Sequence, residues 1–305
     1  VGGNHTDHNH GKVLAAGVDL DTVAAAAKRG DNIIVEKSFK FDALEVDITD
    51  LDVHKEEFGK SSGLIRGICA GFVSCGYKIG GFNAASMSRV LSGSGLSSSA
   101  AYEVLIATIL NHLYNDGSIS DVEIAKIAQF AENKYFGKPC GLLDQMTSSV
   151  GGFITIDFED PSKPIINKVD FDFASCGHAL CIVDTGGNHA DLTDDYASIR
   201  KEMESAAEVF GKSVLREVDE DELMKNISLV REKVNDRAVL RAMHFYAENK
   251  RVDAEIAALE SGDFEQFKKL VIESGRSSYM YNQNVFTASD VKHQGVSLAL
   301  AMCEY

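Results

Sequence analysis

A stretch rich in glycine and serine, residues 93–101, carries the residue types that most clearly suggest a chemical function. It reads Gly-Ser-Gly-Leu-Ser-Ser-Ser-Ala-Ala, and glycine lets a backbone take positive φ and approach a ligand closely. The residues from Ser98 to Tyr114 are apolar on most sides and predict a buried helix. Because a helix N-terminus presents free N–H groups and the positive end of the helix dipole, this segment predicts an anion site, with phosphate as the expected anion.

The same stretch has a second interpretation as a linker or a simple helix cap, because glycine–serine runs often serve as flexible connectors. Strand-like residues from Phe82 to Val90 precede it and a strongly apolar helix follows, and this pattern leaves both interpretations open. Two better-known phosphate motifs are absent. His54 stands where a Walker A loop ending at residues 59–61 needs its first glycine, and Ser98 replaces the last glycine of a dinucleotide fingerprint.

Asp144 is the carboxylate whose surroundings most suggest catalysis. It lies among leucines and a methionine in the segment 137–146, which also holds two glycines and a proline. A carboxylate in apolar surroundings needs a hydrogen-bond partner or takes a shifted pKa, and either would suit a general base. An Asx turn or a helix cap explains this residue equally well. Glu132 borders the apolar stripe of the preceding helix, which is usual for a surface residue unless the phosphate loop lies nearby.

Polar residues crowd the first ten positions, which include three histidines. A transition metal could bind such a cluster, but no cysteine or second cluster supports one, and we favour a polar turn before a strand. Asn4, His5 and Asp7 could equally be hydrogen-bonding groups for a polyol, and the sequence alone does not separate these possibilities.

The composition limits the classes of partner. The chain has 305 residues, which suits two domains, and its formal net charge of −16 argues against binding to nucleic acid or to anionic membrane surfaces. No apolar run is long enough to span a membrane. None of the six cysteines forms a Cys-x-x-Cys pair, so we expect reduced thiols in a cytoplasmic protein. Because the sequence lacks an initial Met and stops within a predicted helix, we expect the natural protein to extend beyond both ends.

Strand and helix patterns place these motifs in a mixed fold of class α+β. Short β-branched or alternating apolar runs predict strands or hairpins at 12–26, 33–35, 44–48, 82–90, 151–158 and 178–184. Helical patterns are found at 64–73, 98–114, 194–210, 219–227, 230–248, 254–259, 264–273 and 291–305. Ser120 and Glu123 form a capping box that begins a further helix. Because helices dominate after residue 170, we expect domains at 1–170 and 171–305.

Three segments, in this order, resemble the galactokinase branch of the GHMP kinase superfamily. They are Asn-His-Thr-Asp at 4–7, the glycine–serine loop at 93–101, and Cys-Gly-Leu-Leu-Asp-Gln at 140–145. The loop is typical of GHMP kinases in general, and the other two segments narrow the resemblance to the galactokinase branch. A later part of this chain resembles the tyrosine-containing segment of that branch, through Asn188, Asp194-Asp195-Tyr196 and Arg200. The similarity runs through most of the chain.

The resemblance implies a two-domain GHMP kinase fold with the active site in the cleft between the domains. The implied reaction is ATP- and Mg²⁺-dependent phosphorylation of the anomeric hydroxyl of galactose, with Asp144 accepting the hydroxyl proton. Ser99 and Glu132 would hold Mg²⁺, which prefers hard oxygen ligands. The ATP phosphates would lie against Gly93, Ser94, Gly95, Leu96, Ser97, Ser98 and Ser99. The implied sugar-binding residues are Asn4, His5, Asp7, Gly141, Asp144 and Tyr196.

Asn4 departs from the family pattern, because the family has a glutamate there that bonds a sugar hydroxyl. A hydrogen bond to a charged group contributes about 1.5–3 kcal/mol, so this change would weaken galactose binding or favour another substituent. The family's catalytic arginine and third glycine-rich motif are expected before Val1 and after Tyr305, outside this sequence. Two alternatives therefore stay open. One is a kinase for a related sugar, such as N-acetylgalactosamine or an arabinose-like acceptor, and the other is a non-catalytic galactose and ATP sensor.

Overall fold

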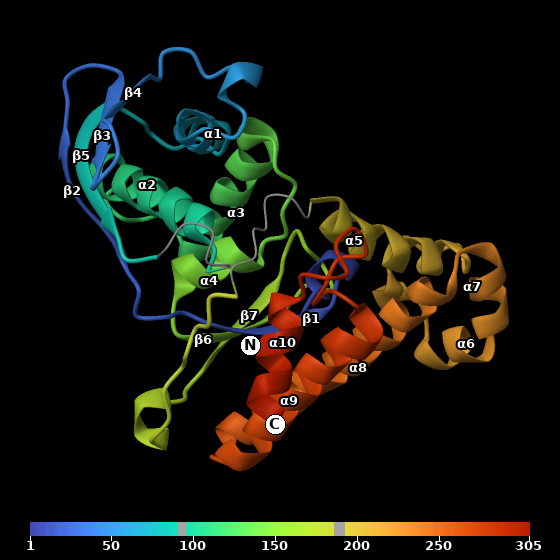
Figure 1. The fold of residues 1–305 in the computed structure, drawn as a ribbon. Helices are drawn as coiled ribbons and strands as arrows, with labels where there is room; N and C mark the ends of the chain where they lie inside the picture. The colour runs from blue at the N-terminus through green and yellow to red at the C-terminus, as the bar shows by residue number, and fades with distance from the viewer. Residues whose placement is uncertain (91–95, 186–192) are drawn as a thin grey trace. The chain divides into compact units, whose positions relative to one another are not determined.

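The chain folds into two compact units that do not follow one another along the sequence. We describe it from a computed structural model, which gives residues 1–90, 96–185 and 193–305 (Figure 1). The terminal unit consists of Val1–Ala16 and Phe153–Tyr305, and the central unit consists of Gly17–Gly152. The fold combines helices with two small sheets, as the α+β prediction requires.

The central unit is built on a four-stranded mixed sheet of order β2–β5–β3–β4. Its strands are β2 (Thr22–Lys28), β3 (Ile33–Ser38), β4 (Leu44–Asp47) and β5 (Phe82–Ser88). Strands β3 and β5 run parallel with Ile34 opposite Phe82, and the other pairings are antiparallel. Helices α1 (Ser61–Ser74) and α2 (Ser98–Tyr114) pack against one face of this sheet, and α3 (Asp121–Ala131) packs against these two helices (Figure 1). A short π-helix, Glu132–Phe136, extends α3, and α4 (Leu143–Val150) completes the unit.

Local sequence signals explain these helices well. The helix predicted at 64–73 is confirmed as part of α1, and its apolar residues at helical spacing, Ile65, Ile68, Cys69 and Phe72, are all fully buried. Helix α2 has the predicted bounds. At the start of α3 the Ser120 side chain accepts a hydrogen bond from the backbone N–H of Glu123, as the capping box predicts. Helices α1 and α3 approach closely at Gly67, where a Cβ atom would lie only 2.8 Å from the Cβ atom of Ala131.

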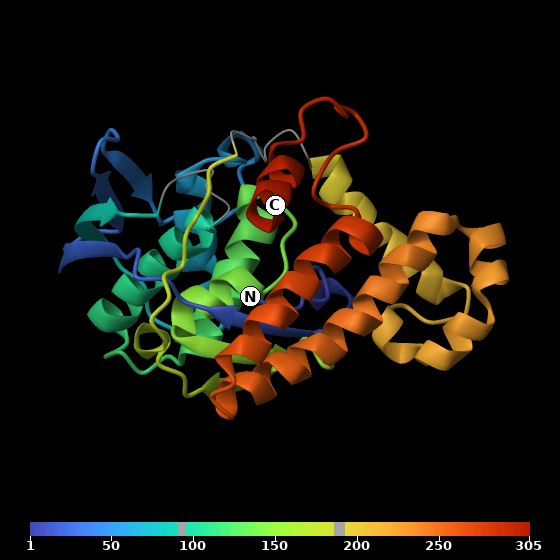
Figure 2. The same ribbon diagram turned by 60° about the horizontal axis from the view of Figure 1, so that its bottom comes forward.

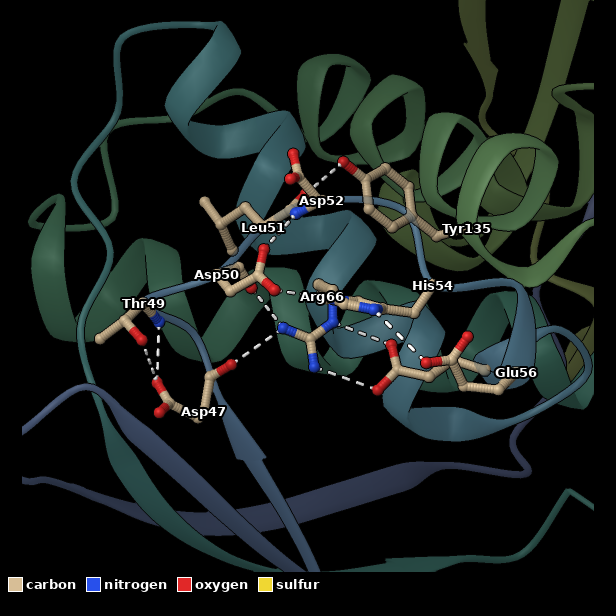
Figure 3. Close-up of polar contacts among 10 residues, drawn as sticks. Asp47, Thr49, Asp50, Leu51, Asp52, His54, Glu56, Arg66 and Tyr135 are labelled. Atoms are coloured by element: carbon tan, nitrogen blue, oxygen red, sulfur yellow. Dashed lines mark hydrogen bonds and ion pairs between the residues drawn. The ribbon is translucent and has the colours of Figure 1, made fainter.

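Arg66 on α1 holds the irregular segment after β4 in place (Figure 3). Its guanidinium donates two hydrogen bonds to the Glu57 carboxylate, at 2.8 and 3.0 Å, and further bonds to the carbonyl oxygens of Asp47 and Asp50. The side chain is 10% exposed and that of Glu57 is 17% exposed. Arg66 therefore satisfies polar groups of a segment whose regular structure is limited to the short 3₁₀ turn Lys55–Glu57.

The terminal unit combines both ends of the chain in a three-stranded antiparallel sheet of order β1–β6–β7. Its strands are β1 (Lys12–Ala16), β6 (Phe153–Asp157) and β7 (Ile165–Val169). The helices are α5 (Thr193–Glu208), α6 (Glu220–Lys225), α7 (Ile227–Lys233), α8 (Asp236–Glu260), α9 (Phe264–Ser277) and α10 (Gly295–Glu304). Helices α8 and α9 lie side by side (Figure 1 and Figure 2). Four short 3₁₀ and π turns complete this unit: Asp7–Asn9, Phe173–Cys176, Leu215–Glu217 and Ser278–Asn282.

The structure corrects several expectations from the sequence. The strand predicted at 178–184 is wrong, because these residues lie in no strand and Leu180, Ile182 and Val183 are exposed. The strand that completes the sheet is β7, which the sequence pattern did not reveal. The helix predicted at 230–248 is divided between the end of α7 and the first half of α8, and the helix predicted at 254–259 is the end of the same continuous α8. Residues 12–26 form no hairpin, since β1 pairs with β6 and β2 pairs with β5.

The domain boundary expected near residue 170 falls inside the terminal unit, just after β7. The change from strands to helices at that point is a change of element type, whereas the division into units follows the pairing of β1 with β6. Within the described residues, the structure has no helix that is both long and apolar enough to cross a membrane.

Replacing Arg66 with Met should lower the free energy of unfolding by about 3 kcal/mol, because it leaves a half-buried carboxylate and two carbonyl groups without their donor. Urea unfolding of the purified variant measures this loss. Arg29→Met is the matched control, because Arg29 pairs with Asp31 at an exposed site and should unfold at nearly the wild-type urea concentration. Equal midpoints for the two variants would contradict the role given to Arg66.

Candidate functional site

The start of α2 is the part of the glycine–serine loop that the structure describes. Gly93, Ser94 and Gly95 lie outside the described residues, whereas Leu96 through Ser99 lie inside them. Ser97 has a left-handed backbone, with φ of 58°, and its carbonyl accepts the first helical hydrogen bond, from Ala101, at 3.1 Å. The first N–H groups of such a helix have no acceptor within the helix, so anion binding by this loop stays a prediction that the described residues allow.

A buried carboxylate, Glu132, connects the start of α2 to two other segments of the central unit. Its Oε1 atom accepts hydrogen bonds from the Ser99 hydroxyl and the Lys138 ammonium, each at 3.0 Å. Its Oε2 atom accepts a bond of 2.7 Å from the side-chain amide of Gln145. Glu132 is 2% exposed, so it is not the surface residue that its border position favoured. The structure thus brings together Ser99 and Glu132, the two residues predicted to share a metal ion.

A second carboxylate, Glu103, lies behind the first and was missed by the sequence analysis. Gln145 Nε2 also donates to Glu103 Oε2 at 3.1 Å, so one amide bridges two buried carboxylates. Burial, followed by the charge of Glu132, raises the pKa of Glu103 to about 8. Glu103 therefore holds its proton at neutral pH, which lowers the cost of placing two carboxylates so close together. Its position four residues after Ser99, on the same face of α2, was the available signal.

Lys138 was not singled out from the sequence either. Burial lowers its pKa, but the adjacent Glu132 carboxylate, with a smaller contribution from Asp144, outweighs this effect and the pKa is raised overall. Lys138 is therefore a permanent cation beside the start of α2. The same cluster keeps Cys140 protonated, because burial and the Glu132 charge both raise the pKa of the thiol.

Asp144 occupies the first turn of α4, where a negative charge is favoured by the helix dipole. Its side chain is exposed, whereas Leu142 and Met146 are buried. The apolar surroundings expected from the sequence are absent because residues two apart on a helix point in different directions. The Asp144 charge nevertheless contributes to the raised pKa values of Glu103 and Lys138, so Asp144 acts on the same cluster. Gly141 lies exposed just before this helix.

In the terminal unit, the first residues of the chain form a cluster with α5. The ring of His5 lies 5.7 Å from the ring of Tyr196 and 5.7 Å from that of His8, measured between centroids. Asp7 begins the 3₁₀ turn that follows, and its pKa is raised by burial and lowered to a smaller extent by the charge of His5. The structure therefore brings together His5, Asp7 and Tyr196, three of the residues that the resemblance implies as sugar-binding. Asn188 and the side chain of Asp194 lie outside the described residues.

The histidines of this cluster are neutral at physiological pH. Burial, followed by the charge of His8, lowers the pKa of His5 to about 4, and burial followed by Arg200 lowers that of His8 to about 4. A neutral imidazole has one donor and one acceptor, which suits a hydroxyl-rich ligand. In the described part of the chain, no three His, Cys, Asp or Glu side chains converge as they would around a metal ion.

Asn4 is held by two contacts with the helical part of the terminal unit. Its side-chain amide donates to the Ser278 hydroxyl at 2.8 Å, and its backbone carbonyl oxygen accepts from His244 Nε2 at 2.8 Å. Because His244 donates through Nε2, its Nδ1 atom accepts from the Ser277 hydroxyl, also at 2.8 Å. Asn4 thus has a fixed position, with its side chain beside a hydroxyl that can either donate or accept.

Comparisons with known proteins find the same two regions. The GHMP kinases N terminal domain matches residues 63–152, and the galactokinase galactose-binding signature matches residues 1–28. The chain is 31% identical to a galactokinase of Streptomyces coelicolor over 278 residues, which cover 90% of this chain and 70% of the relative. It is 32% identical to a galactokinase of Glaesserella parasuis, with 89% and 70% covered. The crystal structure of Lactococcus lactis galactokinase complexed with galactose shares the fold, with a TM-score of 0.76 at 23% identity over 94% of this chain and 74% of that one.

Replacing Glu103 with Gln should make the stability of the protein depend less on pH. The folded protein keeps the Glu103 proton up to about pH 8, whereas the ordinary value is 4.5, so the wild type loses stability as the pH rises between these values. The variant has no such group, and its stability relative to wild type should increase from pH 5 to about pH 8 and level off above that value. Urea unfolding across this range measures the difference.

Glu45→Gln serves as the control for this series, because Glu45 is exposed on β4 of the same unit. Its difference from wild type should stay constant with pH. A constant difference for Glu103→Gln as well would show that Glu103 ionises normally in the folded protein.

Proposed function

The chain belongs to the galactokinase family of the GHMP kinases, and from this premise we propose that it transfers the γ-phosphoryl group of ATP to the anomeric hydroxyl of galactose. The products are galactose 1-phosphate and ADP. The observation that carries this proposal is the presence of both matched regions in one chain, each holding its own cluster of predicted site residues. Asn4, His5 and Asp7 lie in the galactose-binding signature, and Ser99, Glu132 and Asp144 lie in the kinase domain match.

We propose that the loop and the first turn of α2, residues 93–99, hold the phosphates of ATP. Free N–H groups at a helix N-terminus and the positive end of its dipole support this role. The Ser99 hydroxyl and the Glu132 carboxylate meet at 3.0 Å and offer the hard oxygen atoms that Mg²⁺ takes. These two residues therefore fit as its protein ligands, and Mg²⁺ bound there would neutralise charge on the phosphate oxygens.

Asp144 is the proposed general base. It would accept the proton of the anomeric hydroxyl while the sugar oxygen bonds to the γ-phosphorus and the bond to the bridging oxygen of ADP breaks. A carboxylate is the usual side chain for this role, and its place on the first turn of α4 leaves it exposed, where it can reach a substrate hydroxyl. Most of the remaining catalysis is positioning and charge neutralisation, as is usual for phosphoryl transfer.

The sugar hydroxyls would bind to Asn4, His5, Asp7, Gly141 and Tyr196. The neutral His5 ring and the Tyr196 phenol supply donors and acceptors. Their ring centroids lie 5.7 Å apart, so one sugar could contact both side chains. Asn4 gives a specific reason to keep a related sugar as the second candidate substrate, because its amide replaces the family's carboxylate. We also propose a cytoplasmic location, which six free cysteines suit.

The test of the function is an acceptor panel, with ADP release followed in the presence of ATP and Mg²⁺. The panel contains galactose, N-acetylgalactosamine, arabinose, glucose, mevalonate and homoserine. Turnover that is strongest with galactose supports the proposal. If only another sugar is turned over, that sugar is the substrate instead of galactose. Galactose binding without turnover of any acceptor would indicate a sensor.

Asp144→Asn should lower kcat by about 10²–10⁴-fold, because the amide cannot take up the hydroxyl proton. The affinity for ATP should stay within about twofold of wild type, since removing the base leaves the phosphate contacts intact. Steady-state kinetics and calorimetric ATP binding give the two values. A variant with wild-type kcat would remove Asp144 from the role of base.

Asn4→Glu should lower the KM for galactose by about tenfold, because a charged acceptor strengthens a hydrogen bond to a sugar hydroxyl. Ser278 can donate to the new carboxylate in place of the bond it now accepts, so the fold should tolerate the change. The same acceptor panel measures the effect. A KM that is unchanged or higher for galactose and lower for another sugar would show that Asn4 is adapted to that sugar.

A further inference from the structure

Lys138 places a positive charge beside the proposed phosphate site, because its ammonium pairs with the Glu132 carboxylate. Its Nζ atom lies 3.0 Å from Glu132 Oε1, the same oxygen that accepts the Ser99 hydroxyl bond. The two donors therefore share one atom, which places the ammonium beside the first turn of α2.

The two partners of this ion pair differ sharply in exposure. The Glu132 side chain is 2% exposed, whereas that of Lys138 is 60% exposed. The carboxylate is fixed by Ser99 and Gln145 and cannot turn to solvent, but the lysine reaches it from outside on a flexible four-carbon stem. A mobile ammonium anchored on a buried carboxylate can exchange that oxygen for a ligand oxygen without unfolding anything around it.

From this geometry we infer that Lys138 binds a phosphate oxygen of ATP beyond the α-phosphate and stabilises the charge on the transferred phosphoryl group. The inference rests on the proposed function, because it assigns a residue to the same reaction. In the protein without nucleotide, Lys138 neutralises Glu132. When the nucleotide binds, the ammonium moves to the phosphate oxygens and frees Glu132 Oε1 for another cation.

The experiment compares nucleotides that differ only in their number of phosphates. The dissociation constants of ATP and AMP are measured by calorimetry on the full chain in EDTA, so that no divalent ion contributes. Lys138→Met should weaken ATP binding by about tenfold or more, since a charge-assisted hydrogen bond is lost, and should change AMP binding by no more than about twofold. With Mg²⁺ and galactose, its kcat should fall by about a hundredfold.

Two further variants separate this role from a structural one. Lys138→Arg keeps the charge and should retain most of the ATP affinity. Lys134→Met is the matched control, because Lys134 lies on the same π-helix as Glu132 but places its ammonium over the Phe130 ring, 5.3 Å from its centroid. This control should bind both nucleotides and turn over as wild type does. If Lys138→Met fails to fold, a double variant that combines Lys138→Met with Glu132→Gln takes the place of the single variant in the binding comparison. The double variant leaves no unpaired buried charge at this position.

Equal losses for ATP and AMP, or no loss for either, would overturn the inference. Failure of the proposed function gives a different result. A wild-type protein that binds ATP but phosphorylates no sugar would refute the kinase activity, while the ATP and AMP comparison would still decide the phosphate contact. An active wild type with Lys138→Met indistinguishable from Lys134→Met would refute Lys138 alone. A wild-type protein that binds no nucleotide would overturn both.

Discussion

The buried Glu132 carboxylate is the interaction on which the arrangement of the central unit depends. A carboxylate that is 2% exposed is costly unless several donors compensate it. Here the donors come from the start of α2, from the segment after the π-helix and from α4, through Ser99, Lys138 and Gln145. Because each segment must reach the same carboxylate, the positions of the proposed phosphate loop and the proposed base are fixed by one electrostatic requirement.

Much of the fold could be predicted because it is encoded locally. The buried face of α1, the bounds of α2 and the cap at Ser120 all depend on residues within a few positions of each other. Strand pairing is not local. The sequence pattern contains no signal that β1 pairs with β6 or that β7 completes the sheet. The apolar residues at 178–184 suggested a strand, although Leu180, Ile182 and Val183 are exposed. Pairing partners far apart in the sequence decide these outcomes.

The candidate site was predictable to the extent that its residues lie in recognisable segments. Ser99 and Glu132 were named together on the resemblance alone, and their side chains meet. Glu103 and Lys138 were missed because their importance comes from burial and from charge, which appear only when α2, α3 and α4 are packed. The exposure of Asp144 shows the opposite error, since apolar neighbours in sequence are not neighbours in space on a helix.

The terminal unit is built from two distant parts of the chain, and this has a consequence for its folding during synthesis. Strand β1 ends at Ala16, and its partner β6 begins only at Phe153. On the ribosome, β1 must therefore wait for the whole central unit to be made before it can pair. The two ends of the central unit lie side by side, since the Gly17 N–H donates to the Gly152 carbonyl at 2.9 Å. All strands of this unit have been synthesised before β6. We expect it to fold first and, by closing its own ends, to bring β1 to the emerging β6.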